Sequence, residues 1–296
     1  MKAIEVNNLF KSYGGKKAVN GLSFDVNQGE IMGLIGPNGA GKSSTIKMML
    51  DFIKPDSGEI NLFGQGMNES LKNDIGYLPE ERGLYKKLTA IDLIVYMATL
   101  KGMDKKSAKK RAEELLSETG MLENKKKKNK DMSKGMGQII QFIVTIIHNP
   151  KLVILDEPFS GLDPVNTEVI KNLISRIKDE GKTIILSTHQ MNKVEEICDR
   201  VLMINKGEAV LYGNVQEIKE GFTKNSVQVV ADGDLKNIPG VAEYKINKDS
   251  VELVPEPEVS PQTILDGIRE KGISIKRFEL TTPSLHEIFL TKAAKS

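Results

Sequence analysis

An apolar run, Ile31–Ile35, leads directly into Gly36-Pro37-Asn38-Gly39-Ala40-Gly41-Lys42-Ser43, and the helical pattern Ser44–Met49 follows. The spacing is G-x-x-x-x-G-K-S between a strand and a helix, in which glycines let successive backbone N–H groups point at a phosphate. The N-terminus of the following helix adds a positive dipole at the same place. The stretch predicts a phosphate-binding loop, with Lys42 facing the β- and γ-phosphates and the Ser43 hydroxyl placed to bind Mg²⁺.

A second strand ends in two adjacent carboxylates, in Leu152-Val153-Ile154-Leu155-Asp156-Glu157. Successive strand residues point to opposite sides, so the two carboxylates are suited to different tasks. Asp156 can hold Mg²⁺ through its water shell, and Glu157 can take a proton from an attacking water, as a general base does. The alternative is that both residues only end a strand.

The composition is that of an ordinary soluble protein. The 296 residues are 39% hydrophobic and 28% charged, and at about 100–200 residues per domain this length predicts roughly two domains. Lys and Arg total 42 against 40 Asp and Glu, so the net charge of +2 does not by itself indicate a nucleic-acid or lipid partner. With no Trp and 5% aromatic residues, the chain also lacks the stacking side chains of a single-strand nucleic-acid surface.

No sequence feature indicates a membrane span, a secretory signal or a disulfide framework. The longest apolar run, Ile139–Ile147, is interrupted by Gln141 and Thr145 and is far shorter than the roughly 18 residues of a span. The first residues lack the apolar centre of a secretory signal, so we expect a cytoplasmic protein. A single Cys198 and three scattered histidines exclude an intrachain disulfide and argue against a zinc cluster.

The charge is concentrated in one place, where Lys125–Lys128 and Lys130 form a basic run. Such a run is usually a solvated loop, which is the interpretation we favour, and a phosphate-binding patch is the alternative.

The pattern along the chain predicts an α/β fold with two domains, residues 1–222 and 223–296. Four short apolar segments are typical of buried parallel strands, Glu30–Ile35, Leu152–Leu155, Thr183–Ser187 and Arg200–Ile204. Ile4–Leu9 and Leu22–Val26 alternate apolar with polar residues and predict antiparallel edge strands with one face in water. Between about 89 and 147 the period is helical, with Leu93, Tyr96, Met97 and Leu100 on one face, so a helical subdomain is inserted in the core.

From about residue 223 the pattern changes to that of a small, separate α+β domain. Its expected strands are Val227–Ala231, Val241–Ile246, Val251–Val254 and Ile273–Leu280, and its expected helices are Thr263–Lys271 and Ser284–Lys292.

With the loop and the carboxylate strand in this order, residues 1 to about 220 resemble the ATP-binding subunits of ABC transporters, a family of P-loop NTPase cassettes. Ser160-Gly161-Leu162-Asp163 is similar to the family's D-loop, and Thr188-His189 to the switch histidine that contacts the γ-phosphate. Tyr13 is similar to the aromatic residue that stacks on adenine. The cofactors that the resemblance implies are therefore ATP and Mg²⁺.

Two further motifs resemble those of the family but differ from its usual sequence. The signature, usually Leu-Ser-Gly-Gly-Gln, is Met132-Ser133-Lys134-Gly135-Met136, which keeps the hydroxyl and the glycine amide that bind the partner subunit's ATP. The position of the Q-loop glutamine is Glu80, whose carboxylate can still reach Mg²⁺. The stretch from Tyr77 to Tyr85 and the Ser-Lys-Gly-Met signature resemble one exporter branch.

The resemblance assigns a role to each motif residue. Lys42, Glu157 and His189 are catalytic, and Ser43, Glu80 and Asp156 hold the metal. The nucleotide is contacted by Tyr13, Gly36, Pro37, Asn38, Gly39, Ala40, Gly41, Lys42, Ser43, Ser44, Ser133, Gly135 and Asp163.

The expected function is ATP hydrolysis that powers export through a separate membrane permease. Ser133 cannot reach its own Lys42 in the family's architecture, so a second cassette, identical or paralogous, is needed. The chain would lie on the inner face of the cell membrane through the permease. The segment Thr282–Leu290 resembles the accessory domain of bacterial multidrug, antibiotic-resistance and sodium-export ATPases. His148 and Cys198 are expected to be packing or loop positions, and His286 a residue on a helix surface.

Two other functions are compatible with the same motifs. One is an ABC-type ATPase that acts on ribosomes or DNA, although such proteins usually carry two cassettes or long coiled coils. The other is a regulatory module that binds ATP and barely hydrolyses it, which Lys134 and Met136 favour slightly and Glu157 disfavours. We expect no nucleic-acid partner.

Overall fold

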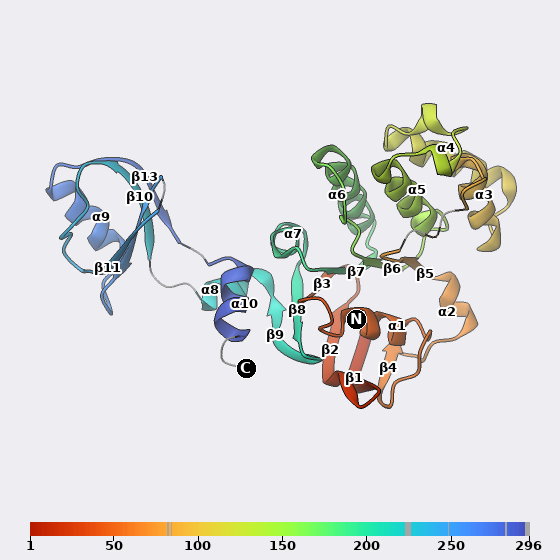
Figure 1. Ribbon diagram of the computed structural model, residues 1–296, viewed down its shortest axis with the longest axis horizontal. Helices are drawn as coiled ribbons and strands as arrows, with labels where there is room; N and C mark the ends of the chain where they lie inside the picture. Colours follow the sequence, from red (N-terminus) through yellow and green to blue (C-terminus); the bar gives the residue numbers. More distant parts are fainter. Residues whose placement is uncertain (82, 84, 223–225, 248, 282, 294–296) are drawn as a thin grey trace. The chain divides into compact units, whose positions relative to one another are not determined.

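A computed structural model of the chain describes residues 1–296 except 82, 84, 223–225, 248, 282 and 294–296 (Figure 1). It divides into two units, Met1–Val215 and Gln216–Ser296. The domain boundary predicted between residues 222 and 223 adjoins residues that lie outside the described part of the chain. In the structure the division comes earlier, at the start of helix α8 (Val215–Gly221).

The centre of the first unit is a six-stranded sheet in the order β5-β6-β7-β3-β8-β9. Five of its strands are parallel, and β9 pairs antiparallel with β8 at one edge. Every position of β3, β6 and β7 is buried, as central strands covered on both faces require. The strands are β3 (Ile31–Ile35), β5 (Ile75–Leu78), β6 (Leu152–Asp156), β7 (Thr183–Thr188), β8 (Arg200–Asn205) and β9 (Glu208–Asn214).

A three-stranded antiparallel sheet packs beside the central sheet, in the order β2-β1-β4. Its strands are β1 (Lys2–Tyr13), β2 (Lys16–Asn27) and β4 (Ser57–Leu62). The prediction that both N-terminal strands lie at edges is wrong for β1, which pairs with β2 on one side and with β4 on the other. The alternating pattern shows that one face is in water, but it carries no information about how many neighbours a strand has.

Helices cover both faces of the central sheet (Figure 1). Helix α1 (Lys42–Met49) fills the space between the two sheets, where Ile46 and Met49 join one apolar core with Leu22 and Leu34. On the opposite face, α6 (Pro164–Asp179) and α7 (Met191–Ile197) follow β6 and β7. A short helix, α2 (Glu69–Asn73), leads into β5.

The predicted helical insertion consists of α3 (Ala90–Leu100), α4 (Lys105–Glu118) and α5 (Lys134–Ile146), with single turns at Leu122–Asn124 and Asn129–Asp131. Each helix has a side-chain cap at its start, from Thr89, Asp104 and Ser133 respectively. The predicted apolar face of α3 is only partly right. Leu93 is buried, but Tyr96 and Leu100 are 44% and 62% exposed, because the helix turns Ala90, Ile94 and Ala98 inward.

The second unit is a four-stranded antiparallel sheet, in the order β11-β12-β10-β13, with one helix packed on it. The strands and helices lie close to the predicted ranges: β10 (Val227–Asp232), β11 (Val241–Ile246), β12 (Val251–Pro255), β13 (Ser274–Leu280), α9 (Pro261–Glu270) and α10 (Leu285–Ala293). Val227, Val229 and Leu253 of the sheet pack against Ile264 and Ile268 of α9. In both units together, no helix among the described residues has the length and apolarity of a membrane span.

Gly33, in the middle of β3, provides a test of the packing between the sheet and α7. A Cβ at this position would lie 2.7 Å from Val194 Cγ1 and 3.1 Å from Cys198 Sγ, so a methyl group would force the helix away from the sheet. Gly33→Ala should lower the free energy of unfolding by about 1–3 kcal/mol, measured by thermal or urea denaturation. Gly66→Ala is the matched control, because nothing lies within 4 Å of a Cβ there. Equal stability of the two variants would contradict this packing.

Candidate functional site

The loop between β3 and α1 has a backbone shape that only glycine allows at two points. Gly36 and Gly41 have φ angles of +154° and +115°. A Cβ would lie 2.1 Å from the carbonyl oxygen of Ile204 at Gly36, and 2.4 Å from that of Ala18 at Gly41. Gly41 also stands at the N-cap of α1 with no side-chain cap, so the helix presents its N-terminal N–H groups and positive dipole to a bound anion.

The Lys42 ammonium is hydrogen-bonded to the loop that precedes α1. Nζ donates hydrogen bonds to the carbonyl oxygens of Gly36 at 2.7 Å and Pro37 at 3.2 Å, and the residue is 7% exposed. Burial lowers the pKa of Lys42, while the carboxylates of Glu157, Asp156 and Glu80 act in the opposite direction. The loop therefore positions a partly desolvated cation, whose charge is balanced by nearby carboxylates.

Glu157 lies at the end of β6 and is held by the neighbouring strand. Its backbone has a φ of +51°, and its side chain is buried. Thr188 donates to Oε2 at 3.0 Å, and the backbone N–H of His189 donates to Oε1 at 3.0 Å. The His189 ring nitrogen Nδ1 lies 2.8 Å from Oε1. Thr188 and His189 thus fix both carboxylate oxygens of Glu157.

Asp156 and Glu80 supply the other carboxylates of the site. Asp156 is 4% exposed, and its pKa is raised by burial, to which the nearby Glu80 and Glu157 add, while Lys42 opposes the shift. A buried carboxylate with a raised pKa is stabilised by a cation. No group of three His, Cys, Asp or Glu side chains that could hold a metal occurs among the described residues. Proteins bind Mg²⁺ through one or two carboxylates together with substrate phosphates, and Asp156 and Glu80 are carboxylates of this kind.

These residues line one pocket of about 470 Å³, a volume within the range of small-molecule sites. Most of the predicted site residues meet here: Tyr13, Asn38, Gly39, Ala40, Gly41, Lys42, Ser43, Ser44, Glu80, Asp156, Glu157 and His189. Gly36 and Pro37 contribute through their carbonyl groups, which accept from Lys42. Three further residues line the pocket, Lys16, Ala18 and Ser160. Lys16 and Ala18 were not predicted, and Ser160 was named in the D-loop but not predicted to contact the nucleotide.

The position of Lys16 follows from the hairpin between β1 and β2. Tyr13 pairs with Lys16 across the turn, which brings a second cation to the mouth of the pocket beside the tyrosine ring. Tyr13 itself is 48% exposed, and Lys11 Nζ lies 5.8 Å from the centre of its ring. The two glycines between the paired residues were the sequence signal for this turn.

Ser133, Gly135 and Asp163 do not line this pocket. They meet at another place, where α5 and α6 begin. Ser133 is exposed and accepts from the Met136 N–H at 3.2 Å. Asp163 caps α6 by accepting from the Asn166 N–H at 2.9 Å, and the Asn166 amide also donates to Asp163 at 2.6 Å. A Cβ on Gly135 would lie 2.3 Å from that amide nitrogen, so α5 and α6 touch at this glycine.

The histidine and the cysteine predicted as packing positions in the cassette are largely withdrawn from water. Burial lowers the pKa of His148 to about 4, and the ring nitrogen Nε2 lies 3.2 Å from the carbonyl oxygen of Ile75. Cys198 is buried, and burial raises the pKa of its thiol, so the reactive thiolate form is disfavoured. Neither residue lines the pocket.

Comparison with known proteins gives consistent matches over both units. Residues 19–160 match the family "ABC transporter", and residues 213–293 match "ATP-binding protein DrrA1-3-like, C-terminal domain". The chain is 41% identical to the uncharacterized ABC transporter ATP-binding protein YhaQ of Bacillus subtilis, over 98% of each chain. It is 36% identical to the bacitracin transport ATP-binding protein BcrA of Enterococcus faecalis, over 78% of this chain and 76% of BcrA.

A solved structure, described as an ATP-binding subunit of an ABC transporter, has the same fold. It superposes with a TM-score of 0.69 at 30% identity, and the match covers 74% of this chain and 93% of that one. The family match spans the loop between β3 and α1 and the two carboxylates at the end of β6.

The position of Glu157 predicts how a single change should affect turnover. Glu157→Gln keeps the shape and the hydrogen bond from Thr188 but cannot accept a proton. ATP hydrolysis should therefore fall by about 10²–10⁴-fold, while nucleotide affinity stays within about threefold, as measured by steady-state turnover and by titration with a fluorescent nucleotide.

Glu168→Gln provides the matched control, because Glu168 lies on the surface of α6, where it pairs with Lys171. This variant should hydrolyse ATP at the rate of the unaltered protein. Turnover by Glu157→Gln at a similar rate would exclude Glu157 as the base.

Proposed function

Because the chain belongs to the family of ABC transporter ATP-binding subunits, we propose that it hydrolyses Mg²⁺-ATP between two cassettes and so drives export through a separate membrane permease. The proposal rests on one observation, which is that the loop between β3 and α1 lines the same pocket as Glu157 and His189. One wall of this pocket can bind phosphates, and the other can activate water.

Lys42 and the start of α1 would stabilise the triphosphate. The ammonium now donates to two carbonyl groups, and the open N-terminus of the helix lies beside it. A γ-phosphate in the pocket would accept hydrogen bonds from the Lys42 ammonium and from the N–H groups at the start of α1. These donors are therefore already in place for the negative charge that develops on the phosphate oxygens during phosphoryl transfer. Tyr13 offers a half-exposed aromatic face for the adenine, and Lys16 a cation near the same end.

Ser43, Asp156 and Glu80 would hold Mg²⁺. All three line the pocket and provide the hard oxygen donors that this ion prefers. When bound, the ion would neutralise phosphate charge. The bound cation would also keep the buried Asp156 carboxylate ionised, because a positive charge favours the charged form.

Glu157 would act as the general base, and His189 as its positioning partner. The carboxylate receives hydrogen bonds from the Thr188 hydroxyl and from the His189 backbone N–H, and these fix the direction of its two oxygens. A water between Glu157 and the γ-phosphate would lose its proton to the carboxylate as it attacks phosphorus. The His189 ring is 54% exposed, so it can contact a γ-phosphate as well as Glu157.

Ser133, Gly135 and Asp163 would complete the site of a second cassette. They lie outside the pocket of their own chain, and Ser133 is exposed at the start of α5, where the helix dipole favours an anion. A head-to-tail pair of cassettes would bring this surface against the partner's ATP. ATP would then be needed for the pair to close, and hydrolysis would let it open.

Export is supported by the kind of relatives that the chain has. BcrA is a bacitracin transport protein, and the C-terminal unit matches a domain named for DrrA-like ATP-binding proteins. We propose an integral permease as the partner, with the chain on the cytoplasmic face of the membrane and no nucleic-acid partner. In the family the permease docks near Glu80–Tyr85, of which residues 82 and 84 lie outside the described part of the chain.

Mixing two inactive variants tests the composite site. Ser133→Arg and Lys42→Ala should each abolish most hydrolysis, because each alters both sites of a homodimer. In a mixed dimer, one site keeps both Lys42 and Ser133, and the other carries both lesions. The mixture should therefore recover hydrolysis above either parent, measured as phosphate release at constant total protein.

The double variant Ser133→Arg/Lys42→Ala serves as the control for this mixing experiment. Mixed with Ser133→Arg, it leaves no complete site and should recover nothing. Normal hydrolysis by Ser133→Arg alone would refute the composite site, and failure of the mixture to recover would refute sufficiency of one site.

The second unit is proposed to regulate the cassette without supplying catalytic groups. Every residue that lines the nucleotide pocket lies between Tyr13 and His189, and the second unit has its own apolar core. A chain ending after Gly221 should bind ATP within about threefold of the full chain, as measured by titration, but should differ in dimer fraction or in permease-stimulated hydrolysis. A folded truncation that cannot bind ATP would overturn this division.

A further inference from the structure

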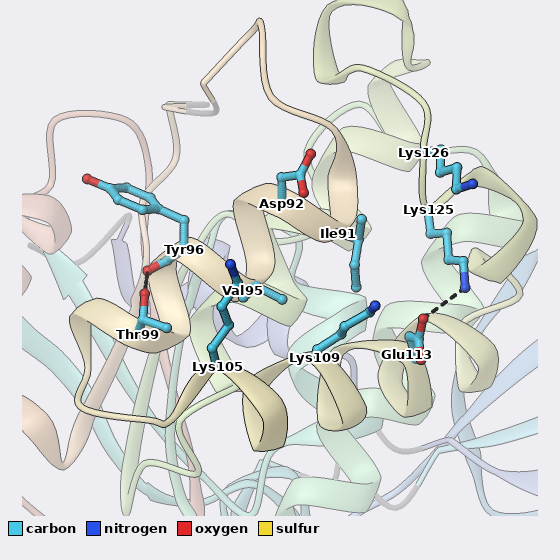
Figure 2. Close-up of a pocket in the computed structure, with 10 residues that line it drawn as sticks. All are labelled: Ile91, Asp92, Val95, Tyr96, Thr99, Lys105, Lys109, Glu113, Lys125 and Lys126. Atoms are coloured by element: carbon cyan, nitrogen blue, oxygen red, sulfur yellow. Dashed lines mark hydrogen bonds and ion pairs between the residues drawn. The ribbon is translucent and has the colours of Figure 1, made fainter.

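A hollow of about 720 Å³ lies between α3 and α4, and it shares no residue with the nucleotide pocket (Figure 2). Ten residues line it, from α3, from α4 and from the basic run that follows α4. Its volume falls within the range of sites that enclose a small organic molecule. None of its residues has a role in the nucleotide chemistry proposed above.

The basic run is fixed against α3 by its backbone. The N–H groups of Ala90 and Ile91, in the first turn of α3, donate to the carbonyl oxygens of Lys127 at 3.1 Å and Lys125 at 3.0 Å. An isolated antiparallel β-bridge also pairs Thr89 with Lys128. The loop therefore caps the helix, and this places the Lys125 and Lys126 side chains at the hollow. The interpretation of the run as merely a solvated loop is incomplete.

The hollow has more cations than acids. Lys105 and Lys109, one turn apart on α4, extend toward α3 in Figure 2, and Lys125 and Lys126 stand on the loop. The two acids on the wall are already engaged.

Glu113 pairs with Lys125 at 2.8 Å, and Asp92 accepts from the Thr89 hydroxyl at 2.6 Å. Lys105, Lys109 and Lys126 form no ion pair within 4 Å with another residue in the described ranges. The Thr89 hydroxyl is neutral and leaves the Asp92 charge in place, so the four lysines exceed the two acids by two charges, and a bound anion would offset this excess.

One side of the hollow is apolar. Ile91 and Val95 of α3 face it, and Tyr96 lines its far end, with its ring pointing away from these two residues in Figure 2. Tyr96 is 44% exposed and packs edge-on against Tyr85, with ring centres 5.9 Å apart. A ligand that fits this wall carries an apolar or aromatic group next to its charge.

We propose that this hollow binds an organic phosphate that has an apolar part, either as a free molecule or as the headgroup region of an anionic lipid. Lysine is a common phosphate ligand because its compact ammonium acts as a point charge with several donors. A phosphate monoester carries up to two negative charges, which equals the excess of four lysines over two acids on the wall of the hollow. The apolar group lies against Ile91, Val95 and Tyr96.

The test measures binding of two probes to the full chain at low ionic strength. Phenyl phosphate, titrated by calorimetry, represents the free molecule. Phosphatidylcholine vesicles that contain phosphatidylglycerol, followed by flotation, represent the lipid. The triple variant Lys105→Gln/Lys109→Gln/Lys126→Gln should lose affinity at least about tenfold for the probe that binds, and added salt should weaken binding to the unaltered chain.

The chain offers a closely matched control, Lys106→Gln/Lys110→Gln/Lys127→Gln. It removes the same charge from the same helix and loop, but none of the three residues lines the hollow. Its affinity should change by less than about threefold, because only long-range attraction is lost. Lys42→Ala should retain the binding, which separates this site from the nucleotide pocket. Glu113→Gln releases Lys125 and should tighten binding.

Binding of either probe with loss only in the first triple variant supports the proposal, and the probe that binds identifies the source of the phosphate. Equal loss in both triple variants would show diffuse surface attraction and overturn it. The proposal also fails if neither probe binds the unaltered chain, or if Lys42→Ala abolishes the binding.

Discussion

The pairing of β7 between β3 and β6 is the constraint on which the rest of the cassette depends. The three strands run in parallel, so their carboxyl ends lie together, and three separate stretches of sequence meet at one edge. The phosphate loop follows β3, Asp156 and Glu157 end β6, and Thr188 ends β7. Because Asp156 is opposite Ser187 in the register, Thr188 is in position to donate to Glu157.

This edge concentrates charge that would be costly to bury in isolation. Lys42 is enclosed by its own loop but stands near three carboxylates, and Asp156 is among them with a raised pKa. Ser133 and Asp163 lie away from these carboxylates, at the starts of α5 and α6. The N-terminus of a helix favours an anion.

The helical insertion connects these features to the basic run. The loop that carries Lys125–Lys128 caps α3, and a short turn, Asn129–Asp131, then leads to Ser133 at the start of α5. The segment that places cations at the hollow therefore continues directly into the residue that is proposed to reach the partner's ATP. Gln141, further along α5, donates weakly to the carbonyl oxygens of Pro79 and Glu81, so one helix contacts both the signature and the segment around Glu80.

The sequence by itself determined the chemistry of the nucleotide pocket and the class of fold. The G-x-x-x-x-G-K-S loop and the Asp156–Glu157 pair are local patterns whose function depends on neighbours within a few residues, and continuous apolar runs identified the parallel strands. What only the tertiary structure decided depends on contacts between distant segments. β1 proved to be the middle strand of its sheet, Tyr96 and Leu100 faced outward, and Lys16 and Thr188 joined the site. Hydrophobic period shows which face is buried, but the pairing of strands and helices decides what that face touches.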